Sequence, residues 1–226
     1  MCKESGSGAR CKDKLIMTAN YKQIIADCED FLEKYGDTHK GVGWLKDQDV
    51  DHRYRVVLES IKPEHHPCSI LDYGCGLAHL YQYMNENGIS DIHYTGLDAS
   101  EKYLDFCRGK FPDVEFIYGD IFDENLSLPS YDYVILNGIF SSKRSLTQSE
   151  MMDYMTRLLK EIWKYAKHGI AFNVHSKQVD WERDDLFHLP MDELAQMVCK
   201  ELSRHFVVRH DYGTYEYTTY VYKERQ

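Results

Sequence analysis

Hydrophobic positions follow two alternating patterns through the middle of the chain. Short apolar runs bounded by turn residues predict five strands, over Ser69–Tyr73, Ile92–Leu97, Val114–Tyr118, Tyr131–Leu136 and Gly169–Val174. Apolar residues at helical spacing between these runs predict helices over His79–Asn87, Glu101–Lys110 and Glu150–Ala166. Strands that alternate with helices in this order run parallel and are joined by right-handed crossovers. The pattern therefore predicts a doubly wound α/β fold.

The C-terminal part of the chain changes to a hairpin pattern. Beyond a helix predicted over Met191–Leu202, the segments Phe206–Arg209 and Tyr215–Tyr222 flank turn residues at 211–213. This hairpin adds two strands, one of them reversed, to the five parallel strands. The expected architecture is a seven-stranded, mostly parallel sheet with a C-terminal antiparallel hairpin.

Two helices are predicted ahead of the sheet. Apolar residues recur at helical spacing from Tyr21 to Tyr35, and Gly36 ends that helix. Asp51 can cap a second helix that runs to Ile61. The residues before Tyr21 are mostly polar and include Gly and Ser. These patterns divide the chain into a loose N-terminal leader, an N-terminal helical lid and an α/β domain, over residues 1–20, 21–65 and 66–226.

Composition and charge disfavour several classes of function. The chain holds 27 Lys and Arg against 37 Asp and Glu, a formal net charge of −10 that repels a phosphate backbone, so no nucleic-acid partner is expected. No apolar run approaches the ~18 residues of a membrane span, and the first residues lack the apolar region of a secretory signal, so no membrane partner is expected. The seven cysteines form no C-x-x-C pair, which disfavours a disulfide framework or a zinc site. We expect a reduced, cytoplasmic protein.

A glycine-bearing segment joins the first predicted strand of the sheet to the helix that follows it. It reads Ile-Leu-Asp-Tyr-Gly-Cys-Gly-Leu-Ala over 70–78, and Gly74 and Gly76 let the backbone turn tightly and approach a ligand. Dinucleotide-binding enzymes share the G-x-G pattern, but here His79 stands in place of their third glycine. Asp72 would repel a pyrophosphate and suits the cationic amino-acid end of S-adenosylmethionine. The segment favours S-adenosylmethionine over a nicotinamide or flavin cofactor.

Two further acids follow the second and third predicted strands. Asp98 lies where an acid can accept hydrogen bonds from both ribose hydroxyls of a bound nucleoside. Its alternative role is to cap the next helix, which Ser100 can also do. Asp120 falls just beyond the third strand, at the same edge of the sheet, where it can also bind the ligand. The alternative interpretation is that Asp120 is an ordinary aspartate in a turn. Asp72 and Asp98 together indicate sites for an amino acid and a ribose at this edge of the sheet.

These motifs resemble the class I (Rossmann-like) S-adenosylmethionine-dependent methyltransferase superfamily, roughly from Cys68 to the C-terminus. The resemblance implies S-adenosylmethionine as cofactor, with Asp98 on the ribose. It also implies that Asp120 accepts a hydrogen bond from the adenine amino group and that the backbone of Ile121 serves the adenine ring nitrogen. A parallel sheet that ends in a hairpin is the architecture of this superfamily.

The superfamily also places the reactive methyl beside the end of the fourth strand, which implies that Asn137 and Gly138 line the site through their backbone groups. The N-terminal lid should fold over the same edge, where Trp44 could shield the methyl group from water and Arg53 could meet a carboxylate. Plain packing of Trp44 and a solvated charge on Arg53 are the alternatives. The cofactor-binding residues expected in all are Asp72, Gly74, Cys75, Gly76, Asp98, Ala99, Asp120, Ile121, Asn137, Gly138, Trp44 and Arg53.

Motifs of several other methyltransferase groups are missing from the sequence. It has no D/N-P-P-Y/F tetrapeptide of amino-methylating DNA enzymes and no paired-glutamate loop of protein arginine methyltransferases. Asp is also missing where catechol-type enzymes place a metal ligand, so no metal is expected. The segments 137–140 and 172–176 resemble bacterial methyltransferases of small-molecule or saccharide pathways. This resemblance implies a small-molecule acceptor.

Two histidines lie where a general base is expected, at the rim of the strand ends. His175 follows the fifth strand and His210 follows the sixth. His175 is the favoured catalytic base because histidine titrates near neutrality; the alternative is that it only shapes the pocket. His188 is interpreted as a loop or surface residue.

The function that these features favour is transfer of a methyl group to a hydroxyl of a small metabolite in a saccharide or natural-product pathway. N- or C-methylation of a small metabolite is the alternative within the same enzyme class. An oxidoreductase or a non-catalytic cofactor-binding module on the same fold is the alternative from other classes. The acceptor's identity is open at this stage, and a homodimer is compatible with the sequence.

Overall fold

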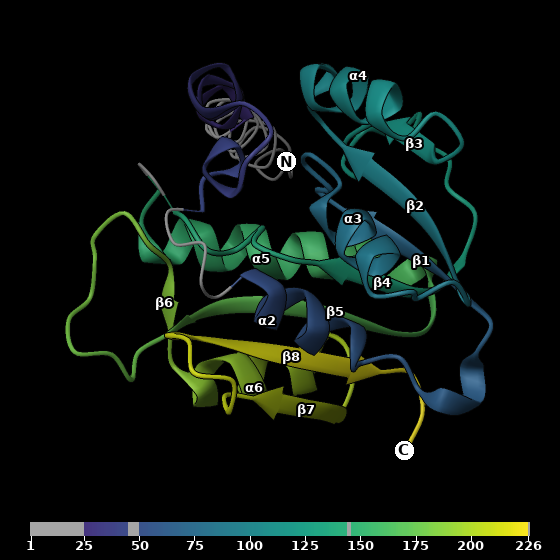
Figure 1. Ribbon diagram of the computed structural model, residues 1–226. Coiled ribbons are helices and arrows are strands. Elements are labelled where there is room, and N and C mark those ends of the chain that lie inside the picture. The colour runs from purple at the N-terminus through teal and green to yellow at the C-terminus, as the bar shows by residue number, and fades with distance from the viewer. Residues whose placement is uncertain (1–24, 45–49, 144–145, 226) are drawn as a thin grey trace, which may run out of the picture.

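One sheet runs through the centre of the computed structural model, which describes residues 25–44, 50–143 and 146–225 (Figure 1). Within these residues the sheet has eight strands. Their bounds are β1 Cys68–Tyr73, β2 Ile92–Asp98, β3 Glu115–Tyr118, β4 Tyr131–Leu136, β5 Ala166–Ser176, β6 His188–Leu189, β7 His205–Arg209 and β8 Glu216–Tyr222.

The order of the strands confirms the predicted fold class. Seven strands are hydrogen-bonded in the order β3-β2-β1-β4-β5-β8-β7, and β6 pairs beside this path with the end of β5. Strands β1 to β5 run parallel, whereas β8 is antiparallel to both of its neighbours, β5 and β7. The chain reverses its direction across the sheet between β1 and β4. In open α/β sheets, ligands bind at such a reversal, outside the carboxyl ends of the strands.

Helices cover both faces of the sheet, as a doubly wound fold requires (Figure 1). Successive residues of β1 point to opposite faces: Ile70 packs in a core cluster with Val57 of one helix layer, and Leu71 packs in a second cluster with Leu158 of the other. The first layer holds α2, α3 and α4, and the second holds α5 and α6. Their bounds are α2 Val50–Leu58, α3 His79–Glu86, α4 Glu101–Lys110, α5 Gln148–Ile162 and α6 Met191–Glu201, with short 3₁₀ turns η1 His39–Val42, η3 Pro63–His65 and η4 Trp163–Tyr165.

Several predicted boundaries move by a few residues. Helix α5 begins earlier than expected because Thr147 and Glu150 form a capping box, in which each side chain accepts a hydrogen bond from the other residue's backbone. It also ends earlier, and the segment predicted as its last turn becomes η4 and the start of β5, where Ala166 pairs with Tyr131. Helix α2 ends at Leu58 rather than at Ile61.

The interpretation of His188 as a loop or surface residue is wrong. His188 forms the two-residue strand β6 with Leu189, pairs with His175 of β5 and is only 5% exposed. Its Nδ1 atom lies 2.7 Å from the carbonyl oxygen of Ser176. A polar residue in so short a strand has no periodicity that could reveal its burial.

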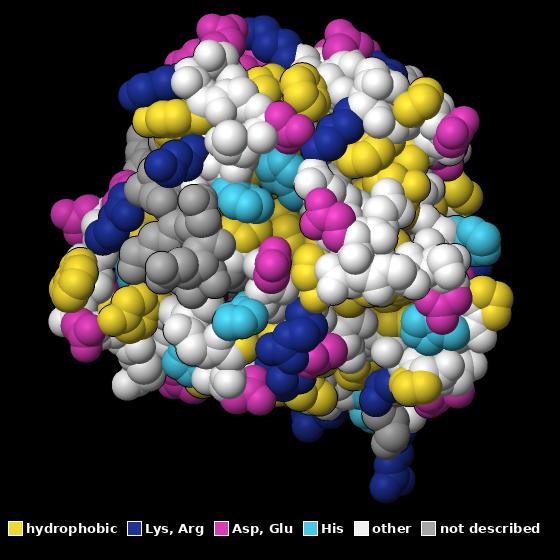
Figure 2. Space-filling model, viewed as in Figure 1, with side chains coloured by type: hydrophobic (Ala, Val, Ile, Leu, Met, Phe, Trp, Pro, Cys, Tyr) yellow, Lys and Arg dark blue, Asp and Glu magenta, His cyan; other side chains and the backbone are white. Residues whose placement is uncertain are grey.

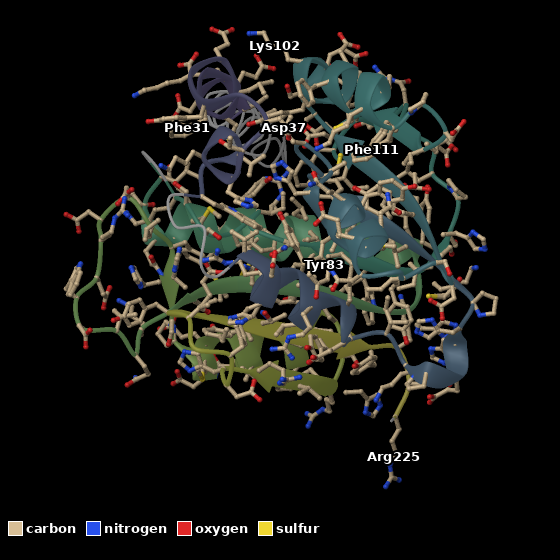
Figure 3. All side chains as sticks on the ribbon, viewed as in Figure 1. Phe31, Asp37, Tyr83, Lys102, Phe111 and Arg225 are labelled. Carbon is tan, nitrogen blue, oxygen red and sulfur yellow. The ribbon has the colours of Figure 1, made fainter. Side chains whose placement is uncertain are left out.

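The N-terminal segment lies beside α4 (Figure 1). Residues 25–35 are helical and end at Gly36, as predicted, whereas the leader over 1–20 and the predicted helix start at Tyr21 lie outside the described residues. The Tyr103 hydroxyl of α4 lies 2.7 Å from the Cys28 carbonyl oxygen and 2.8 Å from that of Gly41. Lys102, at the top of Figure 3, pairs with Glu33 at 2.8 Å. Within the described ranges, no helix has the length and apolar character needed to cross a membrane.

Candidate active site

A cavity of about 170 Å³ opens at the carboxyl ends of β1, β2 and β4, beneath the N-terminal segment. Near the centre of the face in Figure 2, apolar and histidine side chains gather where this part of the surface is hollowed. The lining residues come from the N-terminal segment, from α2, from the loops after the three strands and from the helices that follow. They are Ile25, Cys28, Val42, Trp44, Tyr54, Asp72, Tyr73, Gly74, Cys75, Gly76, His79, Leu80, Leu97, Asp98, Ala99, Ser100, Tyr103, Asn137, Gly138, Ile139 and Tyr154.

The loop between β1 and α3 forms one wall of the cavity. Gly74 and Gly76 have φ angles of +74° and +53°, a region that residues with a Cβ rarely adopt. A Cβ on Gly74 would lie 2.0 Å from the Ile139 side chain, so the loop also needs a glycine for space. The Gly74 amide donates to the Leu97 carbonyl oxygen at 2.7 Å, which fixes the loop against the end of β2.

Asp98 lies at the end of β2 and lines the cavity. Its carboxylate accepts hydrogen bonds from the backbone amides of Gly76 and Ser100, at 2.8 and 2.9 Å. Burial raises the pKa of Asp98 above its ordinary value, although these amides act in the opposite direction. The side chain that caps α4 is that of Ser100, which accepts from the Tyr103 amide. The predicted alternative role of Asp98 as the helix cap therefore belongs to Ser100.

Asp72 is the second carboxylate in the cavity wall and is 3% exposed. The Tyr94 hydroxyl donates a hydrogen bond to it at 2.8 Å. Burial raises the pKa of Asp72 to about 7, the hydrogen bond from Tyr94 counteracts this, and the nearby Asp98 carboxylate adds to the rise. A cation bound beside Asp72 would favour its ionised form.

The end of β4 contributes Asn137 and Gly138 to the cavity. Neither polar atom of the Asn137 side chain has a hydrogen-bond partner among the described residues, although both atoms are buried. Gly138 has a φ angle of +88°, and its amide donates to Asn173 Oδ1 at 2.7 Å. The indole of Trp44 covers Gly138 so closely that a Cβ there would lie 3.0 Å from Trp44 Cζ2. Trp44 is therefore a wall of the cavity.

Three predicted cofactor residues lie outside the cavity lining. Asp120 and Ile121 follow β3 at the same edge of the sheet; Asp120 Oδ1 accepts from the Phe122 amide at 2.9 Å, and Ile121 is 7% exposed. Arg53 of α2 pairs with a carboxylate of the protein itself: its Nε lies 2.8 Å from Glu216 Oε2 and its Nη2 lies 2.9 Å from Glu216 Oε1.

His175, the predicted base, lies in β5, is not among the residues that line the cavity, and has a side chain that is 14% exposed. Its Nε2 atom is 3.7 Å from Glu216 Oε1, and its ring is 5.4 Å from that of His188. Burial lowers the pKa of His175 below its ordinary value, while Glu216 acts in the opposite direction. The imidazole is thus neutral at pH 7 and able to accept a proton. His210 is exposed.

Several residues of this region were missed by the sequence analysis. The tyrosines 54, 103 and 154 line the cavity from three helices, α2, α4 and α5. Asn173 and Glu216 lie behind Gly138 and connect it to Arg53. A polar residue inside the apolar run Ala-Phe-Asn-Val was the available signal for Asn173.

The lining fits S-adenosylmethionine better than a dinucleotide. Among the described residues that line the cavity none is Lys or Arg, whereas two are carboxylates, buried Asp72 and partly buried Asp98. Such a wall suits a cationic amino acid and hydroxyl donors and disfavours a pyrophosphate. The unsatisfied amide of Asn137 provides a further donor and acceptor for a polar ligand.

Comparison with known sequences identifies a family for most of the chain. The sequence model of a family described as a methyltransferase domain matches residues 64–223 of the 226. The Mycobacterium tuberculosis protein Rv1506c (strain H37Rv), whose name provisionally classes it as a methyltransferase, is 28% identical over 162 residues, which are 70% of this chain and 94% of that protein.

Solved structures share the fold. Magnesium protoporphyrin IX methyltransferase (ChlM) from Synechocystis PCC 6803, with bound SAH, superposes with a TM-score of 0.62 at 16% identity, covering 90% of this chain and 100% of that one. The 1,6-didemethyltoxoflavin-N1-methyltransferase of Burkholderia thailandensis, with bound 1,6-didemethyltoxoflavin and S-adenosylhomocysteine, gives 0.60 at 16% identity and covers 90% of each chain.

Proposed function

The chain belongs to the methyltransferase-domain family and uses S-adenosylmethionine, and we propose that it methylates a hydroxyl group of a small molecule. The observation that assigns the cofactor to the cavity is the pair of carboxylates, buried Asp72 and partly buried Asp98, which face it from the ends of neighbouring parallel strands. We further propose that residues 25–44 and α2 act as a lid over that cavity.

S-adenosylmethionine supplies an activated methyl group when it is bound. The chain's own residues bind and orient: Asp72 would hold the amino-acid end, Asp98 the ribose hydroxyls, and the backbone of Asn137 and Gly138 the region near the methyl. Trp44 closes the cavity beside Gly138 and would exclude water from this region. Asp120 and Ile121 would serve the adenine from the end of β3.

Two features support a small acceptor. The proteins with the same fold include one named for a porphyrin and one named for a toxoflavin precursor. The net charge of −10 disfavours a nucleic-acid acceptor. The resemblance of segments 137–140 and 172–176 to saccharide-pathway enzymes favours a hydroxyl-bearing metabolite, and the two segments meet where the Gly138 amide donates to Asn173.

We assign His175 as the general base for a hydroxyl acceptor. It is neutral at pH 7 because burial lowers its pKa, and Glu216 Oε1, 3.7 Å from its Nε2 atom, would stabilise the imidazolium formed when it takes the proton. An amine acceptor is the second candidate. The buried Oδ1 atom of Asn137, which has no partner among the described residues, could accept a hydrogen bond from an N–H group.

Incubation with S-adenosylmethionine that carries a labelled methyl group tests the proposal. The acceptors are a pool of small saccharides and phenols, a matched pool whose hydroxyls are replaced by methoxy groups, and a pool of small amines. Label in the hydroxyl pool alone is the expected result, and His175→Gln should lower that turnover by about 100-fold. Label confined to the amine pool would contradict O-methylation and favour the second candidate.

A further inference from the structure

A network of contacts among five residues lies against the β4 end of the cofactor cavity. Of these five, only Trp44 and Gly138 line the cavity. The Gly138 amide donates to Asn173 Oδ1 at 2.7 Å, and Asn173 Nδ2 donates to Glu216 Oε2 at 2.6 Å. Glu216 holds the Arg53 guanidinium through two hydrogen bonds. Arg53 Cζ in turn lies 5.0 Å from the centre of the Trp44 ring, which covers Gly138.

Glu216 is the central residue of this network. Its side chain is only 4% exposed, and its two oxygens face Arg53, Asn173 and His175. Burial alone would raise the pKa of Glu216, but the charge of Arg53 and the hydrogen bonds from Arg53 and Asn173 act in the opposite direction, and the pKa lies below its ordinary value. The carboxylate is therefore ionised at neutral pH and compensates the charge of Arg53.

The pairing of Arg53 with Glu216 explains how distant parts of the chain are aligned. Arg53 lies in α2 and Glu216 starts β8, so the ion pair joins residues 163 positions apart. Planar guanidinium and carboxylate groups that meet through two parallel hydrogen bonds fix direction as well as distance. With its plane fixed in this way, Arg53 presents a defined cationic surface to the Trp44 indole.

We propose that Glu216 is a positioning residue of the active site, which holds the Trp44 wall through Arg53 and the Gly138 amide through Asn173, and which lies 3.7 Å from His175 Nε2. The inference rests on the proposed function for the identity of the cavity's ligand. Glu216 makes no contact with the cavity itself, so its effect on the ligand is transmitted by these neighbours. Its removal should misplace two walls of the cavity without removing any group that touches the ligand.

Glu216→Gln is the first test, with Glu59→Gln as the matched control. Glu59 is also paired with arginine, with Arg55 at 2.6 Å and Arg209 at 2.7 Å, but its side chain is 35% exposed and lies outside the cavity lining. S-adenosylhomocysteine affinity is measured by calorimetry at a temperature where circular dichroism shows each variant folded. We expect about tenfold weaker binding for Glu216→Gln and a change within about twofold for Glu59→Gln.

The double variant Arg53→Gln/Glu216→Gln separates positioning from stability. Loss of one partner leaves a buried charge uncompensated, whereas loss of both does not, so the double variant should unfold close to the wild-type temperature. We still expect about tenfold weaker binding, because the alignment of Trp44 is lost. Wild-type affinity in a folded Glu216→Gln or in the double variant would overturn the inference.

Trp44 emission provides a readout that does not depend on any ligand. The emission of Trp44 is obtained as the difference between each protein and the same protein with Trp44→Phe. Glu216→Gln should shift this difference spectrum and Glu59→Gln should not; an unchanged spectrum would overturn the inference. If the wild type fails to bind S-adenosylhomocysteine, the proposed function fails, while the emission shift still decides the role of Glu216.

Discussion

The backbone amide of Gly76 donates a hydrogen bond of 2.8 Å to the side-chain carboxylate of Asp98. This bond ties the glycine loop after β1 to the end of β2, so the two strongest motifs of the sequence form one structure. The second carboxylate oxygen accepts from the Ser100 amide at 2.9 Å, at the start of α4. Asp98 therefore shapes the wall of the cavity as well as facing it.

Replacement of Asp98 by Asn should weaken S-adenosylhomocysteine binding by about 10- to 100-fold, because charge-assisted hydrogen bonds to ligand hydroxyls are each worth about 1.5–3 kcal/mol. Titration calorimetry measures the loss. Asp105→Asn on the exposed side of α4 is the matched control and should bind as the wild type does. Equal affinities for the two variants would show that Asp98 does not hold the ribose.

Gly138→Ala tests the Trp44 wall. An Ala at φ +88° is strained and places its Cβ 3.0 Å from Trp44 Cζ2, whereas a Cβ on Gly213, at φ +79°, would have nothing within 4 Å. Both alanine variants should lose about 1 kcal/mol of stability from backbone strain. Only Gly138→Ala should also lose S-adenosylhomocysteine affinity, by about tenfold. Equal affinities in the two variants would show that the contact between Trp44 and Gly138 does not shape the binding site.

Asp72 should make stability depend on pH. Burial raises the pKa of Asp72 in the folded protein from 3.8 to about 7. The protonated carboxyl therefore contributes its full share of the free energy of unfolding below the unfolded pKa, and this share is lost as the pH rises to about 7. The Asp72→Asn variant has no carboxyl here and does not lose stability in this way as the pH rises. Its stability relative to the wild type should increase by about 2–4 kcal/mol between pH 4 and 7 and then level off.

Urea unfolding of Asp72→Asn across that pH range measures the effect. Asp113→Asn, an exposed carboxyl just before β3, is the control for loss of a surface acid. A stability difference between wild type and Asp72→Asn that is constant from pH 4 to 8 would contradict the raised pKa.

His79 should contribute a pH dependence of the opposite sign. Burial lowers its pKa below the ordinary value, and the hydrogen bond with Asp37, at 2.9 Å, counteracts this only in part. The unfolded chain therefore binds the proton more tightly, and stability falls as the pH drops through about 6.5. His79→Gln should lose less stability between pH 7 and 5 than the wild type, as followed by the melting temperature. A parallel pH profile in both proteins would contradict this, and His52→Gln, exposed on α2, controls for loss of a histidine.

Much of the sheet could be predicted because its strands are buried on both faces. The predicted bounds of β4, Tyr131–Leu136, match the structure, since a short apolar run ends there in turn residues. The bounds of α4 match as well, because Ser100 caps its start. The loop over 70–78 was also found, since its glycines and Asp72 lie close together in sequence.

The parts that could not be predicted depend on contacts between distant residues. Strand β6 has two residues and exists through its pairing with β5, which no local pattern records. The sequence left Arg53 to meet a carboxylate or to remain a solvated charge, and the structure pairs it with Glu216, 163 residues away. Nothing near Glu216 in the tyrosine-rich β8 sequence indicates that it is buried or that it is ionised.

A thermal shift experiment with S-adenosylmethionine, S-adenosylhomocysteine and NAD⁺ on the same protein tests the identity of the cofactor most directly. A ligand that binds only the folded state raises the melting temperature in proportion to the logarithm of its concentration once it exceeds the dissociation constant. We predict that both adenosyl compounds raise the melting temperature of the wild type, that Asp98→Asn loses most of this rise, and that NAD⁺ has no effect. Stabilisation by NAD⁺ alone would contradict the assignment of S-adenosylmethionine to this cavity.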